Sequence, residues 1–210
     1  MGNKVGEDDM TTEQSRVLAE AQEWALPEPA IVEANLRAVK AFQNLCKRLL
    51  VKDSDYGVIP GTRGKPTLLK PGAEKIAKLL GLGDTYEILD KTEDWERGFF
   101  AYTIRCSLAQ FSSGRVVSMG LGSCNSMESK YRWRWMWERE LPPGTAEEEF
   151  ASRTLRGGGK QYRVENDDIY TQVNTLLKMA KKRALVDAAL SAGRLSEVFT
   201  QDMEDHADPE

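Results

Sequence analysis

Histidine and cysteine are scarce in this 210-residue sequence, which has one histidine and three cysteines. The histidine, His206, lies near the C-terminal end, and the cysteines Cys46, Cys106 and Cys124 are far apart, with no CxxC pair. A structural zinc site needs about four such ligands at close spacing. The sequence therefore predicts neither a metal site made of protein residues nor a cofactor, and it indicates buried free thiols in a reducing compartment.

Long apolar runs are also missing. No run approaches the roughly 18 residues that would suggest a membrane-spanning helix. The first residues, MGNKVGEDDMTTEQ, are polar and acidic, without the apolar core of a secretory signal. We therefore expect a cytoplasmic protein that does not contact a membrane.

Motifs for catalysis are absent as well. The segment GTRGKPT invites comparison with a phosphate-binding loop, but that loop requires glycine where Ile59 stands and Ser or Thr where Pro66 stands. We find no nucleophile–base pair, no HExxH motif and no convincing set of nuclease carboxylates. ATP use and hydrolysis are poorly supported, and we expect that the protein is not an enzyme.

The charge that is present is unevenly distributed. The chain has a net charge of −4, yet residues 1–30 carry −5, residues 197–210 carry −6 and residues 31–196 carry +7. A basic body with two acidic ends favours a polyanionic partner, although acidic ends also aid solubility by themselves. We expect an acidic N-terminal extension over 1–29, a single domain over 30–196 and an acidic tail over 197–210.

Apolar spacing predicts three helices. Large apolar residues recur at helical spacing over 30–51, and KPGAEKIAKLLGLG is a short helix that Pro71 begins and Gly81 or Gly83 ends.

The third helix is long and lies near the C-terminal end. It is expected to start in the segment ENDDIY, where Asn166 or Asp167 is the cap, and to stop at Gly193. In the tail that follows, Phe199 and Met203 are candidates to anchor the chain on the body.

Between the second and third helices the sequence predicts antiparallel strands. Tyr86 to Leu89 is a short strand, and residues 99–109 alternate between apolar and more polar side chains. FSSG forms a hairpin turn, and RVVSMGLGS returns with Val117, Met119 and Leu121 on one face. Residues 138–165 then form a polar excursion. The predicted fold is α+β, an antiparallel β-meander packed against the long C-terminal helix.

The long helix carries a group of cations among apolar residues. Projected at about 100° per residue, Lys178, Lys181 and Lys182 fall within about 100° of arc, with Arg183 beside them. A helix that is apolar on most sides is packed on most sides, so its charges emerge at one opening. A phosphate backbone would neutralise them. The alternative is a set of lysines at the rim of the core with their amines in solvent.

The segment YRWRWMWERE alternates aromatic and basic residues. As an extended strand it places Tyr131, Trp133, Trp135 and Trp137 on one face, with Arg132 and Arg134 on the other. Bases stack on aromatic rings and phosphates bind guanidinium groups in single-strand binding proteins. Three indoles also make a large apolar surface, so we favour packing in the core or against another subunit over stacking.

Three segments together resemble a known family. LLKPGAEKIAKLLGLGDTYEI, GFFAYTIRCSLAQFSSGRVVSMGLGS and VNTLLKMAKKRALVDAAL resemble the single-strand annealing proteins of the Rad fifty-two superfamily, especially their phage and prophage members. The resemblance covers about residues 65–199. Some phage relatives carry a cysteine-rich zinc ribbon between the sheet and the last helix, where this chain has the cysteine-free segment 138–165.

The resemblance implies an activity and a binding site. Proteins of this family form rings or helical assemblies, hold single-stranded DNA in a basic groove and anneal complementary strands without ATP. The family's phosphate-contacting pair on the long helix corresponds to Lys182 and Arg183, and a basic residue leading the short helix corresponds to Lys70. A phage exonuclease or a host single-strand binding protein is a possible further partner.

The sequence thus predicts an oligomeric phage-type recombination protein that anneals single-stranded DNA without ATP. A passive single-stranded DNA or RNA binding or loading protein is the alternative, and a nuclease is a third class. The expected DNA-binding residues are Lys70, Arg105, Lys130, Arg132, Arg134, Lys178, Lys181, Lys182 and Arg183. Tyr131, Trp133, Trp135 and Trp137 are expected to serve either stacking or subunit contact.

Overall fold

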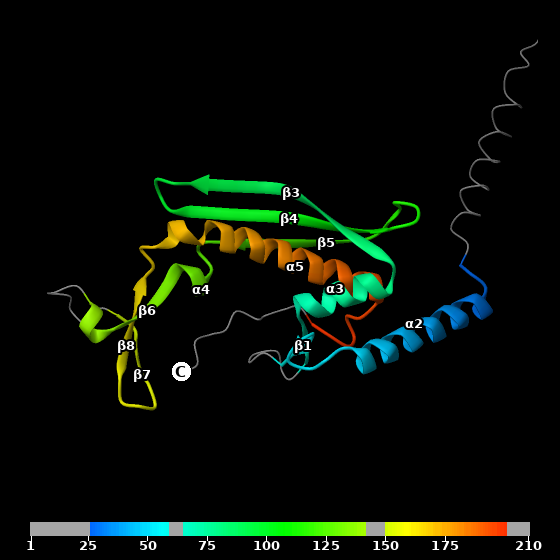
Figure 1. Cartoon of the computed structure of the whole chain (residues 1–210), viewed down its shortest axis with the longest axis horizontal. Coiled ribbons are helices and arrows are strands. Elements are labelled where there is room, and N and C mark those ends of the chain that lie inside the picture. The colour runs from blue at the N-terminus through cyan, green and yellow to red at the C-terminus, as the bar shows by residue number, and fades with distance from the viewer. Residues whose placement is uncertain (1–25, 59–64, 142–149, 201–210) are drawn as a thin grey trace, which may run out of the picture. The chain divides into compact units, whose positions relative to one another are not determined.

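A computed structural model describes residues 26–58, 65–141 and 150–200 (Figure 1). The chain divides into two compact units, Met1–Phe42 and Gln43–Glu210. The helix predicted over 30–51 is present as α2, Pro29–Leu49, and the division falls within it. In the first unit its apolar residues Ile31, Val32 and Leu36 are exposed.

The second unit is built on a three-stranded antiparallel sheet with one helix along its face (Figure 1). The strands pair in the order β3-β4-β5, and their bounds are Leu82–Asp94, Phe99–Gln110 and Val116–Asn125. The long helix α5, Val173–Gly193, packs against β4 and β5. The predicted α+β fold is confirmed.

Strand β3 is much longer than the predicted strand over Tyr86–Leu89. It is an edge strand whose side chains are mostly exposed, so it lacks the apolar alternation that reveals a half-buried strand. A bulge between Ile88 and Asp90 further interrupts its period.

The alternation predicted for β4 is confirmed, and it decides which face of the sheet is inside. Five alternate residues of this strand are buried on the side of α5: Phe100, Tyr102, Ile104, Cys106 and Leu108. On β5 the inner positions are instead Gly120, Gly122 and Cys124. The face shared by Val117, Met119 and Leu121 is therefore the outer one, where all three are exposed.

Two glycines bring α5 against β5. A Cβ on Gly120 would lie 2.2 Å from the Ala188 nitrogen, and one on Gly122 would lie 2.3 Å from the Ala180 carbonyl oxygen. The contact is closed by small residues on the helix side as well, since Ala180, Ala184 and Ala188 are fully buried. The segment Gly120-Leu121-Gly122 thus sets how closely α5 approaches the sheet.

The short helix and the end of the long helix follow the sequence pattern. Helix α3, Lys70–Leu79, has Pro71 in its first turn, and Gly81 follows it with φ +68°. Helix α3 packs on α5. Helix α5 ends at Gly193 as predicted, and Arg194 adopts the left-handed conformation.

The predicted start of α5 is wrong. A short 3-10 helix, η3, spans Ile169–Gln172, and α5 begins only at Val173 without a side-chain cap. Asn166 is used elsewhere, because its amide donates to the Tyr131 carbonyl at 2.9 Å.

Beyond α5 the chain returns to the body. Phe199 is buried and its ring lies 5.4 Å from that of Tyr56, as expected for an anchor. Thr200 closes onto the pair of short strands β1, Tyr56–Gly57, and β2, Thr67–Leu68, where its carbonyl accepts from the Leu68 amide at 3.0 Å. Met203 lies outside the described residues.

A second three-stranded sheet lies between β5 and α5 in the sequence. After the short helix α4, Ser129–Arg132, its strands pair in the order β6-β8-β7, with bounds Trp133–Trp137, Lys160–Glu165 and Ser152–Thr154. A 3-10 helix η1, Glu138–Glu140, follows β6. Part of the expected polar excursion over 138–165 is therefore sheet, in which β8 pairs with the aromatic strand β6 and β7 pairs with β8. Across the parts of the chain that the structure describes, no helix is long and apolar enough to cross a membrane.

Candidate nucleic-acid interface

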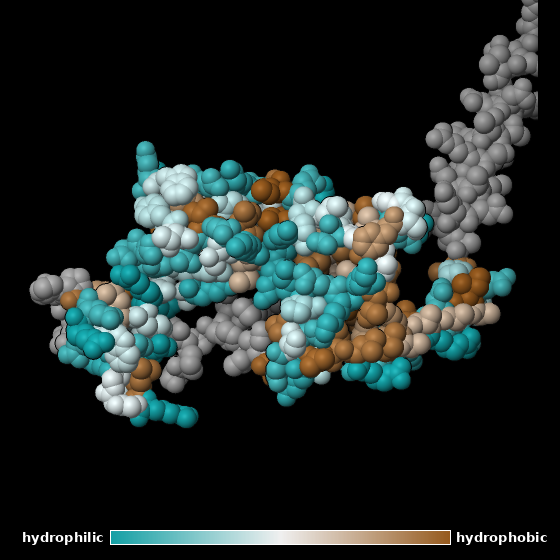
Figure 2. Space-filling view, in the orientation of Figure 1, coloured by the Kyte–Doolittle hydropathy of each residue, from teal (hydrophilic) through white to brown (hydrophobic). Residues whose placement is uncertain are grey.

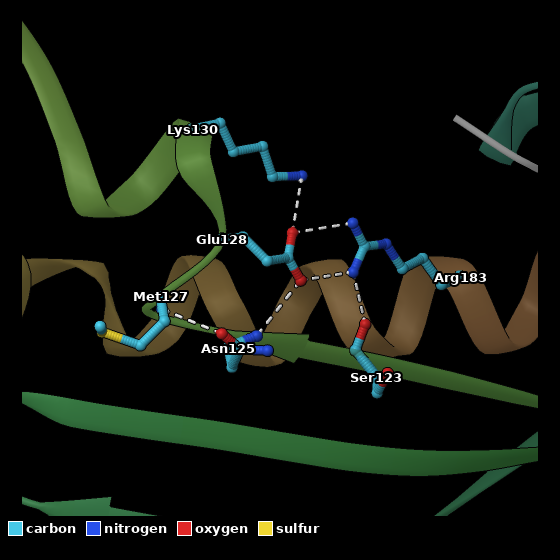
Figure 3. Close-up of polar contacts among 6 residues, drawn as sticks. All are labelled: Ser123, Asn125, Met127, Glu128, Lys130 and Arg183. Atoms are coloured by element: carbon cyan, nitrogen blue, oxygen red, sulfur yellow. Dashed lines mark hydrogen bonds and ion pairs between the residues drawn. The ribbon is translucent and has the colours of Figure 1, made fainter. Parts of the chain in front are cut away.

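Arg183 and Glu128 form the central pair of the candidate site (Figure 3). Arg183 extends from α5, and Glu128 stands in the turn after β5. The guanidinium donates to both carboxylate oxygens, at 2.7 and 2.9 Å, and to the Ser123 carbonyl at 2.5 Å. This reach depends on the close approach at Gly122, whose absent Cβ would lie 2.8 Å from that of Arg183.

Lys130 on α4 approaches the same carboxylate. Its amine lies 3.6 Å from Glu128 Oε2 and 4.7 Å from the centre of the Tyr131 ring. Because the ion pair is long and the lysine side chain is 36% exposed, Lys130 keeps access to solvent. One carboxylate therefore faces two cations.

Lys182 is the third cation of this group. It is half-buried and, among the described residues, makes no hydrogen bond or ion pair. Burial lowers the pKa of its amine, and the positive charges of Lys130 and Arg183 lower that pKa further. We call Lys130, Lys182 and Arg183 the basic cluster; two of its cations, Lys130 and Arg183, pair with Glu128, and both act on Lys182.

The charges of the pair reinforce each other. Burial by itself raises the pKa of Glu128, but the hydrogen bonds and positive charge of Arg183 outweigh it, so the pKa of this carboxyl is lowered. The hydrogen bonds to Glu128 likewise raise the pKa of Arg183 against the effect of burial. Glu128 is thus ionised at neutral pH, and the cluster carries a net charge of about +2.

The other two lysines of α5 lie apart from each other. Lys178 is exposed and stands about 40° from Lys182 in projection, one turn earlier, so it extends the cluster along the helix. Lys181 lies on a different side, with its amine 4.0 Å above the Tyr86 ring of β3. The four cations of the helix therefore do not form one patch, because Arg183 and Lys181 point to opposite flanks.

Two expected site residues lie away from the cluster. Arg105 stands on the outer face of the sheet, opposite to α5, where it pairs with Glu87 of β3. Alternation along β4 requires this, because the neighbouring Ile104 and Cys106 are buried against the helix. Lys70 pairs with Glu74 on α3 at 2.9 Å, and no described contact joins it to the cluster.

The aromatic segment is not one continuous strand. Tyr131 and Arg132 belong to α4, where their amides bond to the Glu128 carbonyl, and Tyr131 is buried. Only Trp133, Trp135 and Trp137 share a strand face, which we call the tryptophan face. The prediction that Tyr131 continues this face is wrong, since the turn after β5 is helical.

The arginines of this segment are paired with acids. Arg132 lies 3.5 Å from Glu165, and Arg134 lies 2.9 Å from Asp167. Arg132 also lies over the Trp133 ring, at 4.8 Å from its centre. Arg134 therefore faces away from the tryptophan face, and Arg132 contributes to it from α4.

Sequence reasoning missed two residues of this region, Arg153 and Arg163. Arg153 on β7 lies 4.1 Å from the centre of the Trp135 ring, and Arg163 on β8 lies 5.2 Å from that of Trp133. The glycines of RGGGK between the two strands are typical of a hairpin and were the available signal. They do not reveal which residues the hairpin places opposite the tryptophans.

The described residues offer no metal site. Among them, no group of three or more His, Cys, Asp or Glu side chains is placed to hold an ion. The three cysteines are buried and unpaired, and burial raises the pKa of both Cys106 and Cys124 to about 11.

Comparison of the chain with protein-family models, with curated proteins and with solved structures gives no match. The family resemblance of the three sequence segments stays a prediction.

Proposed function

We propose that this protein binds single-stranded DNA through the basic cluster and anneals complementary strands without ATP, as an oligomer in homologous recombination. One observation carries the proposal: Lys130, Lys182 and Arg183, from two elements, lie close together with a single carboxylate, which pairs with Lys130 and Arg183, and Lys178 extends them along the same helix.

The physical basis is the unbalanced charge. The positive charges of Lys130 and Arg183 act on a half-buried amine that has no described partner. A phosphate placed there gains charge-assisted hydrogen bonds and releases counterions from the nucleic acid. A DNA backbone is the abundant ligand that supplies such phosphates in a row.

Support for annealing over passive binding comes from the sequence resemblance and the order of elements. A short helix that ends at glycine, a meander of three strands and a long helix follow one another in the structure, in the order typical of annealing proteins. Passive binding or loading of single strands is the second candidate, since the cluster serves it equally well.

An annealing assay tests the proposal. Two complementary dye-labelled oligonucleotides are mixed with the full-length protein, with and without ATP and with and without a divalent metal ion. We expect the protein to accelerate pairing equally in all conditions. Binding without acceleration would leave passive binding as the function, and strand shortening that depends on metal would indicate a nuclease.

A matched pair of variants ties the activity to the cluster. Lys130→Ala with Lys182→Ala removes two charges from it, and Lys47→Ala with Lys91→Ala removes two exposed lysines elsewhere. We expect the first pair to lower single-strand affinity by at least about ten-fold and to flatten its salt dependence, and the second to change neither. Equal single-strand affinity and equal salt dependence of the two double variants would contradict the assignment of the binding site to the basic cluster.

A further inference from the structure

The tryptophan face is the outer face of the small sheet. Trp133, Trp135 and Trp137 stand opposite Glu165, Arg163 and Gln161 on β8, and residues paired in this way point to the same side. The alternate residues of β8, Tyr162 and Val164, are the buried ones. The three indoles therefore belong to the solvent side, where they are half-buried.

Arginines cover this face. Arg153, Arg132 and Arg163 lie over the rings of Trp135 and Trp133, with the guanidinium carbon 4.1 to 5.2 Å from a ring centre. A guanidinium held against an indole is planar and weakly hydrated, and the side turned away from the indole can stack on a base. Part of the guanidinium edge is used within the protein, because Arg153 donates to Gln161 Oε1 at 2.9 and 3.1 Å and Arg163 donates to Ser129 Oγ at 2.6 Å.

The positive charge at this face is local. Residues 132–165 contain seven Arg or Lys and six Glu, a net charge of +1, and three of the arginines lie over the indoles. Figure 2 shows hydrophilic residues over much of the visible surface at the end of the molecule where this small sheet lies. This combination matches a ligand with both aromatic rings and negative charges.

We infer that the tryptophan face, with Arg132, Arg153 and Arg163, is a stacking site for unpaired nucleobases of a single strand. This inference rests on the proposed function for the choice of ligand but concerns a separate surface. The tryptophan face would bind the bases of the strand, and the basic cluster would bind its phosphates. Each base stacks on an indole or on a guanidinium that lies over one, and the positive charge of the arginines attracts the backbone.

The spacing of the rings selects single strands. Alternate residues of a strand are about 6.7 Å apart, twice the roughly 3.4 Å rise of a stacked DNA strand. Bases that occupy successive tryptophans are therefore separated from one another. A duplex, whose bases are stacked and paired, does not offer this arrangement.

Oligothymidine and an abasic oligonucleotide of the same length separate the two sites, because they carry the same phosphates and only one carries bases. We expect the full-length protein to prefer oligothymidine. Trp135→Ala should weaken binding to oligothymidine by at least about five-fold and leave binding to the abasic strand unchanged. Lys130→Ala with Lys182→Ala should weaken both by the same factor.

Control variants test whether a change in affinity comes from the tryptophan face or from a loss of folding or assembly. Trp95→Ala removes an exposed indole outside the face and should change neither affinity. Trp135→Phe retains a ring and Arg153→Lys retains a charge, so the first should keep most of the preference for bases and the second should lose part of it. Melting and sedimentation are measured for every variant.

The outcomes are distinct. A variant Trp135→Ala that binds both strands equally less well, or that changes sedimentation while the preference for bases persists, would overturn the inference; the latter would make the face a contact between copies of the chain. If the double lysine variant changes nothing while Trp135→Ala abolishes the preference for bases, the proposed backbone site fails and the stacking site stands.

Discussion

Arg183 holds Glu128 by both carboxylate oxygens, and this pair joins the long helix to the turn after β5. The same arginine belongs to the pair of residues for which phosphate contact was expected. Part of the Arg183 guanidinium is already bonded to Glu128 within the protein. The negative charge of Glu128 therefore lowers the net positive charge that the basic cluster presents to a ligand.

Glu128→Gln should therefore strengthen single-strand binding. The variant keeps an acceptor for Arg183 but raises the net charge of the cluster by one. We expect affinity to increase by about five-fold at low salt, corresponding to about 1 kcal/mol, with a steeper salt dependence. Glu33→Gln, which removes an exposed carboxylate on α2, is the control. An affinity that falls in Glu128→Gln would mean that Glu128 positions Arg183 for DNA.

Lys182 gives the proposed binding a dependence on pH. Its pKa is lowered, so it loses its proton at a lower pH than an ordinary lysine, and only the protonated amine attracts phosphate. Glu128, whose pKa is lowered, stays ionised at neutral and alkaline pH, and the Cys124 thiol has a pKa raised to about 11. Affinity should then fall as the pH rises from 7 toward 10.

The variant Lys182→Arg tests the source of this effect. Arginine stays charged throughout that range. We expect its affinity to vary less with pH than that of the natural protein, in titrations by fluorescence anisotropy at constant ionic strength. Identical pH profiles for the two proteins would show that another group causes the change.

Gly122→Ala tests the close packing of α5 on β5. The new Cβ would lie 2.3 Å from backbone atoms of the helix, at Ala180 and Ala184, and neither backbone has room to yield without moving α5. We expect a loss of stability of about 1–3 kcal/mol in chemical denaturation. Gly157→Ala is the matched control, because a Cβ there has no neighbour within 4 Å. Equal stability of the two variants would contradict the packing argument.

Removal of the acidic tail after Thr200 should tighten single-strand binding at low salt. The truncation leaves Phe199 and Thr200, which are tied to the body, and removes five acidic residues. Their competition with phosphate is screened over about 8–10 Å at physiological salt, so the gain should shrink as salt rises. Equal affinities of the full-length and truncated proteins at low salt would leave solubility as the role of the tail.

The sequence by itself determined the elements whose periodicity is strong. The alternation over 99–109 reflects the buried and the less buried face of β4, and the apolar residues up to Gly193 reflect a helix that is buried on most sides. The edge strand β3 was largely missed, because most of its residues are exposed on both sides and leave no alternation to read.

Only the tertiary structure decided which charged residues meet. Periodicity places Arg105 on the outer face of the sheet once the buried face of β4 is known. It does not predict that Lys130 of α4 lies near Lys182 and Arg183. Nor does it predict that Glu128 pairs with Lys130 and Arg183. The contact of Arg183 with Glu128 links residues 55 positions apart and depends on the close approach of helix and sheet at Gly122. Likewise, the arginines over the tryptophans follow from strand pairing, which places Arg163 of β8 beside β6 and Arg153 of β7 on the far side of β8. A local sequence pattern predicts which side chains are buried. The charge of a site depends on all the side chains that meet there, and folding brings those side chains together from distant segments.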